Sequence, residues 1–138
     1  MHSCPSAQDG YTITEPAFYI ASPNFPFVFP TGYVCTWFVA PAACSSGQRV
    51  ELNVEYLRTK EGIDGGCLHP FSISPVNGAA TSMCGYRENV RVLADGCTTA
   101  VSFDARASAE LADQGFFLSY RGTYLCYASL GTKACSVN

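Results

Sequence analysis

Apolar and polar side chains alternate with a period of two along several short segments of the chain. In the clearest of them, Val50, Leu52, Val54 and Tyr56 alternate with Arg49, Glu51, Asn53 and Glu55. Successive side chains of a strand point to opposite faces, so the segment from Arg49 to Leu57 predicts a β-strand. One apolar face and one charged face are typical of an antiparallel sheet with one solvated side.

Three further segments alternate in the same way. The residues expected to point inward are Cys35, Trp37 and Val39, then Thr99, Val101, Phe103 and Ala105, and then Phe116, Leu118 and Tyr120. Shorter strand candidates are Tyr11–Thr14, Ala17–Ala21, Phe71–Ile73 and Asn89–Leu93. Turn signals separate these strands every 8 to 12 residues or so, and no amphipathic helix of about ten residues emerges. The pattern predicts an all-β fold in which two antiparallel sheets form a β-sandwich.

Composition narrows the class of protein. The chain has 138 residues, which suits one domain, and its formal net charge is −3. Charged residues make up 14% of it, against about 25% in an average soluble domain. The few basic residues are scattered, so binding to nucleic acid is not expected. No apolar run approaches the roughly 20 residues of a membrane helix, so membrane insertion is not expected either.

Eight cysteines are the strongest compositional signal: Cys4, Cys35, Cys44, Cys67, Cys84, Cys97, Cys126 and Cys135. The chain contains no Cys-x-x-Cys, and its only histidines are His2 and His69. Zinc sites need closely spaced ligand pairs, so an even, well-separated set indicates four disulfides in an oxidising compartment instead. Eight cysteines permit about 105 pairings, so counting alone leaves the connectivity open.

Four separated features of the sequence resemble the CUB domain family. They are Ser22–Pro26 with Phe29-Pro30 and Cys35-x-Trp37, the alternating strand Val50–Tyr56, Cys67 with Cys84-Gly85, and Val101-x-Phe103 with Gly115-Phe116 and Tyr120. The resemblance covers about Cys4 to Tyr124. It implies an extracellular antiparallel sandwich of the jelly-roll type, over residues 1–124, with a disulfide-closed tail at 125–138.

The resemblance also implies two disulfides, Cys4–Cys35 and Cys67–Cys84. The other four cysteines depart from the common pattern of the family. A Cys44–Cys97 disulfide is favoured by elimination, and also because both residues lie in turns just before long strands. Cys126–Cys135 then closes the tail as a local loop.

Many CUB domains bind calcium through acidic loop residues, and this chain departs from that pattern. Glu61 and Asp64 lie near one ligand position, although offset. Pro70 takes the second position. Arg106 takes the third, so the nearest carboxylate is Asp104 on the strand itself. Calcium is bound by six to eight oxygen ligands and is repelled by a cation. No cofactor is therefore expected, and Glu61, Asp64 and Asp104 are only weak calcium candidates.

Catalysis is not expected, because a general base needs an orienting partner that the sequence does not supply for His69. His69 lies in a turn after a cysteine and is expected at the surface. The end loops of a sandwich carry its variable contacts, and here they are Pro26–Tyr33, Arg58–Gly66 and Arg106–Gln114. The candidate contact residues in these loops are Phe27, Tyr33, Arg58 and Arg106, with core packing favoured over exposure for Phe29 and Phe27.

The sequence therefore predicts a secreted, non-catalytic interaction or adhesion module that binds another secreted or cell-surface protein. Two alternatives remain open. One is a structural subunit of a matrix, filament or coat, which would self-associate. The other is a glycan-binding module similar to the spermadhesins.

Overall fold

The alternating segments of the sequence form β-strands. The computed structural model describes residues 11–15, 17–40, 48–62, 65–75, 79–95, 98–107, 113–128 and 131–136, and only the backbone of residues 11, 48–49, 95, 122–128 and 131–136. The strands are β1 (Tyr11–Ile13), β2 (Ala17–Ala21), β3 (Val34–Val39), β4 (Gln48–Thr59), β5 (Phe71–Pro75), β6 (Thr81–Met83), β7 (Gly85–Asp95), β8 (Thr99–Asp104), β9 (Gly115–Ala128) and β10 (Gly131–Ser136). The described part of the chain contains no helix of the length and apolarity that a membrane crossing needs.

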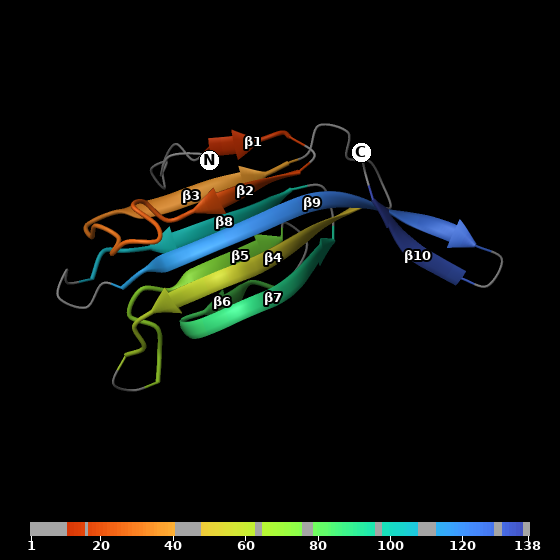
Figure 1. Ribbon diagram of the computed structural model, residues 1–138. Helices are drawn as coiled ribbons and strands as arrows, with labels where there is room; N and C mark the ends of the chain where they lie inside the picture. The colour runs from red at the N-terminus through yellow and green to blue at the C-terminus, as the bar shows by residue number, and fades with distance from the viewer. Residues whose placement is uncertain are drawn as a thin grey trace.

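The strands form two sheets that stack face to face (Figure 1). The first sheet has the order β1-β3-β8-β5-β6, and the second has the order β10-β9-β4-β7, with β2 also paired to β9. All these pairs are antiparallel except β1 with β3. The predicted antiparallel two-sheet sandwich is therefore confirmed.

A cluster of aromatic rings joins the two sheets in the core. Phe116 of β9 contacts three rings of the first sheet, with centroid distances of 5.8 Å to Trp37, 4.5 Å to Phe71 and 5.3 Å to Phe103. All four side chains are fully buried. Edge-to-face and tilted pairs at such distances stabilise a core beyond the area they bury. The inward positions predicted for β3, β8 and the first half of β9 are all buried, as the alternation requires.

A β-bulge reverses the two faces of β4 part-way along the strand. Val50, Leu52 and Val54 point inward as predicted, but beyond the bulge the buried residues are Leu57 and Thr59. The register against β9 shifts between Val54 and Tyr56, which leaves an extra residue in β4. A bulged strand changes the phase of its alternation at that point. The predicted inward position of Tyr56 is therefore wrong, and its ring lies on the outer face.

Two strands are longer than the sequence indicates. β7 runs from Gly85 to Asp95, well beyond the predicted Asn89–Leu93. β9 continues to Ala128 and pairs with β10 to form a hairpin that extends away from the sandwich in Figure 1. The boundary proposed at residue 124 thus lies inside β9.

Candidate functional site

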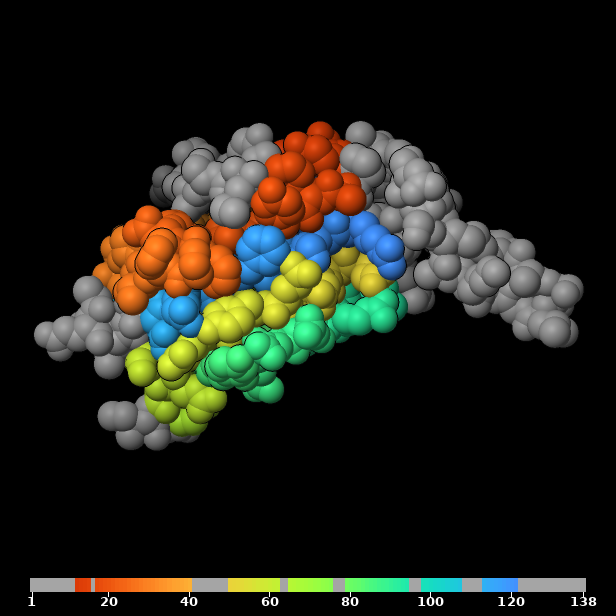
Figure 2. Space-filling model, viewed as in Figure 1, coloured from red at the N-terminus to blue at the C-terminus, as the bar shows by residue number. Residues whose placement is uncertain are grey.

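The outer face of the second sheet carries an ordered set of polar and aromatic side chains. Strand pairing places Tyr19, Ser119, Asn53 and Arg91 in one row across β2, β9, β4 and β7. The next row contains Ala17, Arg121, Glu51 and Leu93. Figure 2 shows this face, with the bands of β7 (green), β4 (yellow), β9 (blue) and β2 (red) side by side.

Five aromatic rings cross the outer face in contact with one another. Tyr19 stacks on Phe117 with centroids 5.4 Å apart, and Phe117 lies 5.9 Å from Phe25. Phe25 is 5.7 Å from Tyr56, which is 5.6 Å from Tyr86. We call Tyr19, Phe25, Tyr56, Tyr86 and Phe117 the aromatic row. Its two ends are open to solvent, because Tyr19 is 43% exposed and Tyr86 is 58% exposed.

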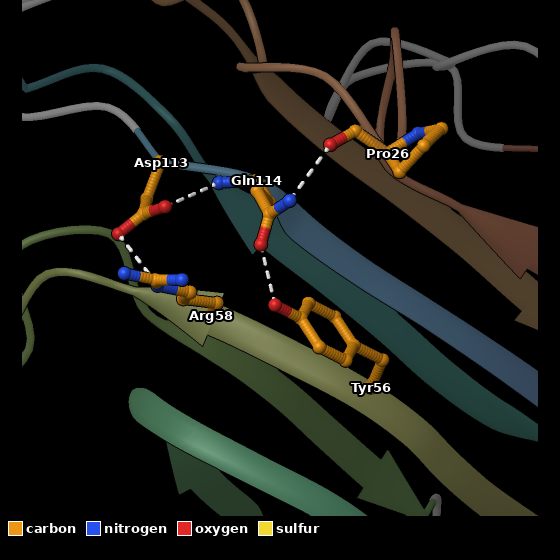
Figure 3. A network of polar contacts seen from close by, with 5 residues as sticks. All are labelled: Pro26, Tyr56, Arg58, Asp113 and Gln114. Carbon is orange, nitrogen blue, oxygen red and sulfur yellow. Dashed lines mark hydrogen bonds and ion pairs between the residues drawn. The ribbon is translucent and has the colours of Figure 1, made fainter.

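The loop from Ser22 to Pro30 borders the aromatic row and is held by polar contacts (Figure 3). Gln114 accepts a hydrogen bond from the Tyr56 hydroxyl, and its amide donates to the carbonyl of Pro26 at 3.2 Å. Asp113 accepts from the backbone N–H of Gln114 at 2.9 Å and pairs with the Arg58 guanidinium at 3.4 Å. The network ties the start of β9 both to β4 and to this loop.

Two hydrophobic side chains in this loop point to solvent. Phe27 is 76% exposed and Val28 is 56% exposed. The prediction that Phe27 packs in the core is therefore wrong. Phe29, by contrast, is buried as predicted, with its ring edge-on to His69 at 5.1 Å and to Phe103 at 5.0 Å. The core position next to the loop is therefore already filled by Phe29, which leaves Phe27 outside.

A carboxylate with two arginines lies on the outer face, across β9, β4 and β7. Glu51 accepts hydrogen bonds from Arg91 and from Arg121, the latter at 3.1 Å. Burial by itself raises the pKa of Glu51, but the two guanidinium groups outweigh it and hold the pKa below its ordinary value. These residues line a shallow groove of about 740 Å³ together with Tyr19, Asn53, Asn89 and Ser119.

The four contact residues predicted from the sequence lie in different places. Phe27 and Arg58 flank the outer face. Tyr33 packs against the core, where burial raises the pKa of its hydroxyl to about 12. Arg106 lies just past the end of β8, in the first sheet.

Sequence reasoning missed most of the aromatic row. One signal was present, because Phe117 stands between the inward-pointing Phe116 and Leu118 and so had to face outward. A large aromatic residue on the polar side of a strand marks a candidate contact surface.

Arg106 forms a two-pronged ion pair with Asp104. Its Nε donates to Oδ1 at 3.0 Å and its Nη2 donates to Oδ2 at 2.8 Å. The Arg106 guanidinium holds the pKa of Asp104 below its ordinary value. Both carboxylate oxygens of Asp104 are therefore engaged by a cation of the same loop.

His69 is fully buried, so the prediction of a surface position is wrong. Backbone hydrogen bonds on either side hold its loop against the core, from Leu68 to Lys60 at 3.2 Å and from Asp104 to Pro70 at 3.0 Å. Neither ring nitrogen has a hydrogen-bond partner among the described residues. The geometry thus shows no group in the described chain that would orient His69 as a base.

One disulfide lies within the described residues, between Cys67 and Cys84, whose Cα atoms are 5.5 Å apart. It is the pair that the resemblance implies. Cys35 is buried and disulfide-bonded, but Cys4, its implied partner, lies outside the described residues. Cys44 and Cys97 also lie outside them, as do the side chains of Cys126 and Cys135. The other three pairings stay predictions.

No protein-family model matches the chain, and no curated protein is significantly similar to it in sequence. Solved structures do match. The CUB1-EGF-CUB2 region of human MASP-1/3 superposes with a TM-score of 0.70 at 21% identity, over 87% of this chain. The chain has a CUB-like fold.

Two other solved structures support the same fold. The extracellular region of zebrafish Gpr126/Adgrg6 matches over 90% of this chain, with a TM-score of 0.74 and 18% identity. The CUB2 domain of MASP-1 matches over 81%, with a TM-score of 0.67 and 17% identity. The chain spans 15% of the zebrafish protein, 42% of the human MASP-1/3 region and 97% of the CUB2 domain.

The MASP-1 CUB2 structure is of a domain bound to Ca²⁺, which raises the question of whether the residues of this CUB-like chain fit that ion. The carboxylate of Asp104 is engaged by Arg106, and Asp64 lies outside the described residues. Among the described residues, no three His, Cys, Asp or Glu side chains gather closely enough to hold a metal ion. The described donors therefore do not fit calcium.

Proposed function

We propose that the chain is a non-catalytic extracellular module that binds another secreted or cell-surface protein. The observation that carries this proposal is the aromatic row on the outer face, with Phe27 and Val28 exposed beside it. One fold neighbour is the extracellular region of zebrafish Gpr126/Adgrg6, which supports the extracellular setting.

The composition of the surface favours a protein as the partner. Tyrosine, phenylalanine and arginine are enriched in protein interfaces, and tyrosine and arginine are frequent among the residues that dominate binding energy. The outer face combines the aromatic row with Arg58, Arg91 and Arg121, each of which exposes more than half of its side chain. Full burial of one exposed phenylalanine such as Phe27 stabilises a complex by about 1.5–3 kcal/mol. A partner that covers this loop thus gains roughly ten-fold or more in affinity from one residue.

The test is a binding screen of the purified chain against a library of secreted and cell-surface ectodomains. We expect at least one ectodomain to bind the wild-type protein, and Phe27→Ser and Tyr86→Ser each to weaken that binding at least ten-fold. Thr81→Ala and Ser82→Ala are the matched controls, because both exposed residues lie on β6 at the edge of the other sheet.

Three outcomes would overturn the proposal. One is binding of an ectodomain that is indifferent to Phe27→Ser and Tyr86→Ser. Another is self-assembly at micromolar concentration by light scattering, without any ectodomain bound, which would favour a structural subunit. The third is selective binding on a glycan array without a protein ligand, which would favour a glycan-binding module.

A further inference from the structure

Glu51 positions two arginine side chains on the solvated face of the second sheet. Arg121 lies directly opposite Glu51 in the β4–β9 pair, whereas Arg91 lies diagonally across the β4–β7 pair. Each guanidinium bonds a different oxygen of the carboxylate. Cross-strand pairs of this kind fix the directions of otherwise flexible side chains. The two arginines are therefore held on either side of Glu51.

The charges in the groove are unequally exposed. The side chain of Glu51 is 13% exposed, whereas those of Arg91 and Arg121 are 66% and 53% exposed. The groove therefore presents cations to solvent, with the single anion below them. Its charged lining sums to +1, one carboxylate against two guanidinium groups, although the whole chain carries −3. Each guanidinium has five N–H donors, so donors remain free after the bonds to Glu51 are made.

Asn53 in the groove and Leu93, which is next to Glu51 but not part of the groove lining, fit a peptide. Asn53 lines the groove, and its buried side-chain carbonyl has no hydrogen-bond partner among the described residues. Leu93 is directly opposite Glu51 in the strand pair and is 50% exposed. A peptide offers N–H donors, carboxylates and apolar side chains together. A polyhydroxylated sugar offers no apolar side chain to cover Leu93.

We propose that this groove receives an acidic side chain of the protein partner, with its carboxylate between Arg91 and Arg121 and an apolar neighbour on Leu93. The inference rests on the proposed function and states the chemistry of the partner. A carboxylate that bridges two guanidinium groups makes charge-assisted hydrogen bonds, which are the stronger kind. Complementary charge also speeds the encounter and excludes basic partners.

The test uses a fluorescein-labelled peptide rich in glutamate and leucine, and a matched peptide in which every glutamate is glutamine. Fluorescence polarisation measures the binding of both to the whole chain at low and high salt. We expect the acidic peptide to bind more tightly, and more weakly as salt increases. Arg91→Gln and Arg121→Gln should each lower its affinity about ten-fold, equivalent to about 1.4 kcal/mol.

Arg106→Gln is the matched control, because Arg106 is also an exposed arginine paired to a carboxylate, 70% exposed, but lies outside the groove. It should leave the affinity unchanged. Equal binding of the two peptides, or equal effects of all three substitutions, would overturn the inference. So would a sulfated hexasaccharide that binds the wild-type chain more tightly than the peptide and loses this binding in Arg91→Gln and Arg121→Gln. An ectodomain that requires Phe27 but tolerates both groove substitutions would overturn the inference alone and leave the proposed function in place.

Discussion

Replacement of Gly115 by alanine should destabilise the fold far more than the loss of a glycine in a loop usually does. Gly115 begins β9 with φ +89°, in the region that favours glycine. A Cβ atom there would lie 2.0 Å from the Ser22 hydroxyl oxygen and 2.8 Å from the Ser22 Cβ. Because the short contact includes the Cβ of the buried Ser22, a change of the Ser22 rotamer alone does not relieve it.

The cost has two parts that a control separates. The left-handed backbone costs an alanine about 1–2 kcal/mol. Displacement of Ser22 breaks the bond that its hydroxyl accepts from the Phe116 N–H at 3.0 Å, and a buried donor left unpaired costs about 1–3 kcal/mol. Gly32→Ala carries only the first part, because Gly32 has φ +100° and no heavy atom within 4 Å of the added Cβ. We therefore expect Gly115→Ala to be about 2 kcal/mol less stable than Gly32→Ala.

Urea unfolding with the disulfides intact measures this difference, followed by the fluorescence of Trp37. Trp37 is the only tryptophan and is fully buried, so its emission changes on unfolding. With a slope near 2 kcal/mol per molar urea, the midpoints of the two variants should differ by about 1 M. Midpoints within about 0.25 M of each other, a difference of about 0.5 kcal/mol, would refute the packing argument.

Three further variants test other contacts. The pKa of Glu51 is lowered from 4.5. Its ion pairs therefore stabilise the fold above that pH, and this stabilisation is lost as the pH falls through the folded pKa. Between pH 5 and pH 2.5, the urea midpoint of Glu51→Gln should fall less than that of the wild type. Burial raises the pKa of Tyr33 to about 12, so the wild-type protein should lose stability between about pH 10 and 12. The Tyr33→Phe variant should lose less stability over this range, and the loss that remains in the variant comes from Tyr120. At pH 7 the Tyr33→Phe variant should be as stable as the wild type or about 1 kcal/mol more stable, because the buried hydroxyl has no partner among the described residues. Cys67→Ser with Cys84→Ser opens a loop with a sequence separation of 17 and should cost about 3 kcal/mol in urea unfolding under non-reducing conditions.

Alternation in the sequence predicts the sandwich and most of its core, because the inward phase of a strand is a local property. In β3, β8 and β9 the apolar residues occupy every second position without interruption, so only one register buries them. The segment Val54-Glu55-Tyr56-Leu57 is different, because Tyr56 and Leu57 are both apolar and either one can point inward. Pairing with β9 and β7 points Leu57 inward, and the residue between Val54 and Tyr56 forms the bulge.

The candidate surface could be predicted only in part, because exposure depends on what else fills a site. Phe27 and Phe29 are alike in sequence, two residues apart and between prolines. The space beside Phe103 and His69 accepts one ring, and Phe29 takes it. Nothing local to Phe27 shows that this position is filled. The pairing of Glu51 with Arg91 and Arg121 likewise depends on strands 40 and 70 residues away in the chain.

The core and the proposed binding surface lie on opposite faces of the same strands. Along β9, Phe116, Leu118 and Tyr120 point inward to the core, whereas Phe117, Ser119 and Arg121 lie on the outer face. The bulge in β4 extends this division, because it buries Leu57 and brings Tyr56 into the aromatic row. Substitutions at outer positions therefore leave the core packing intact, and away from ion pairs and hydrogen bonds they typically change stability by less than about 0.5 kcal/mol. A loss of binding in Tyr86→Ser or Arg121→Gln can thus be assigned to the surface itself, provided that the urea midpoint is unchanged.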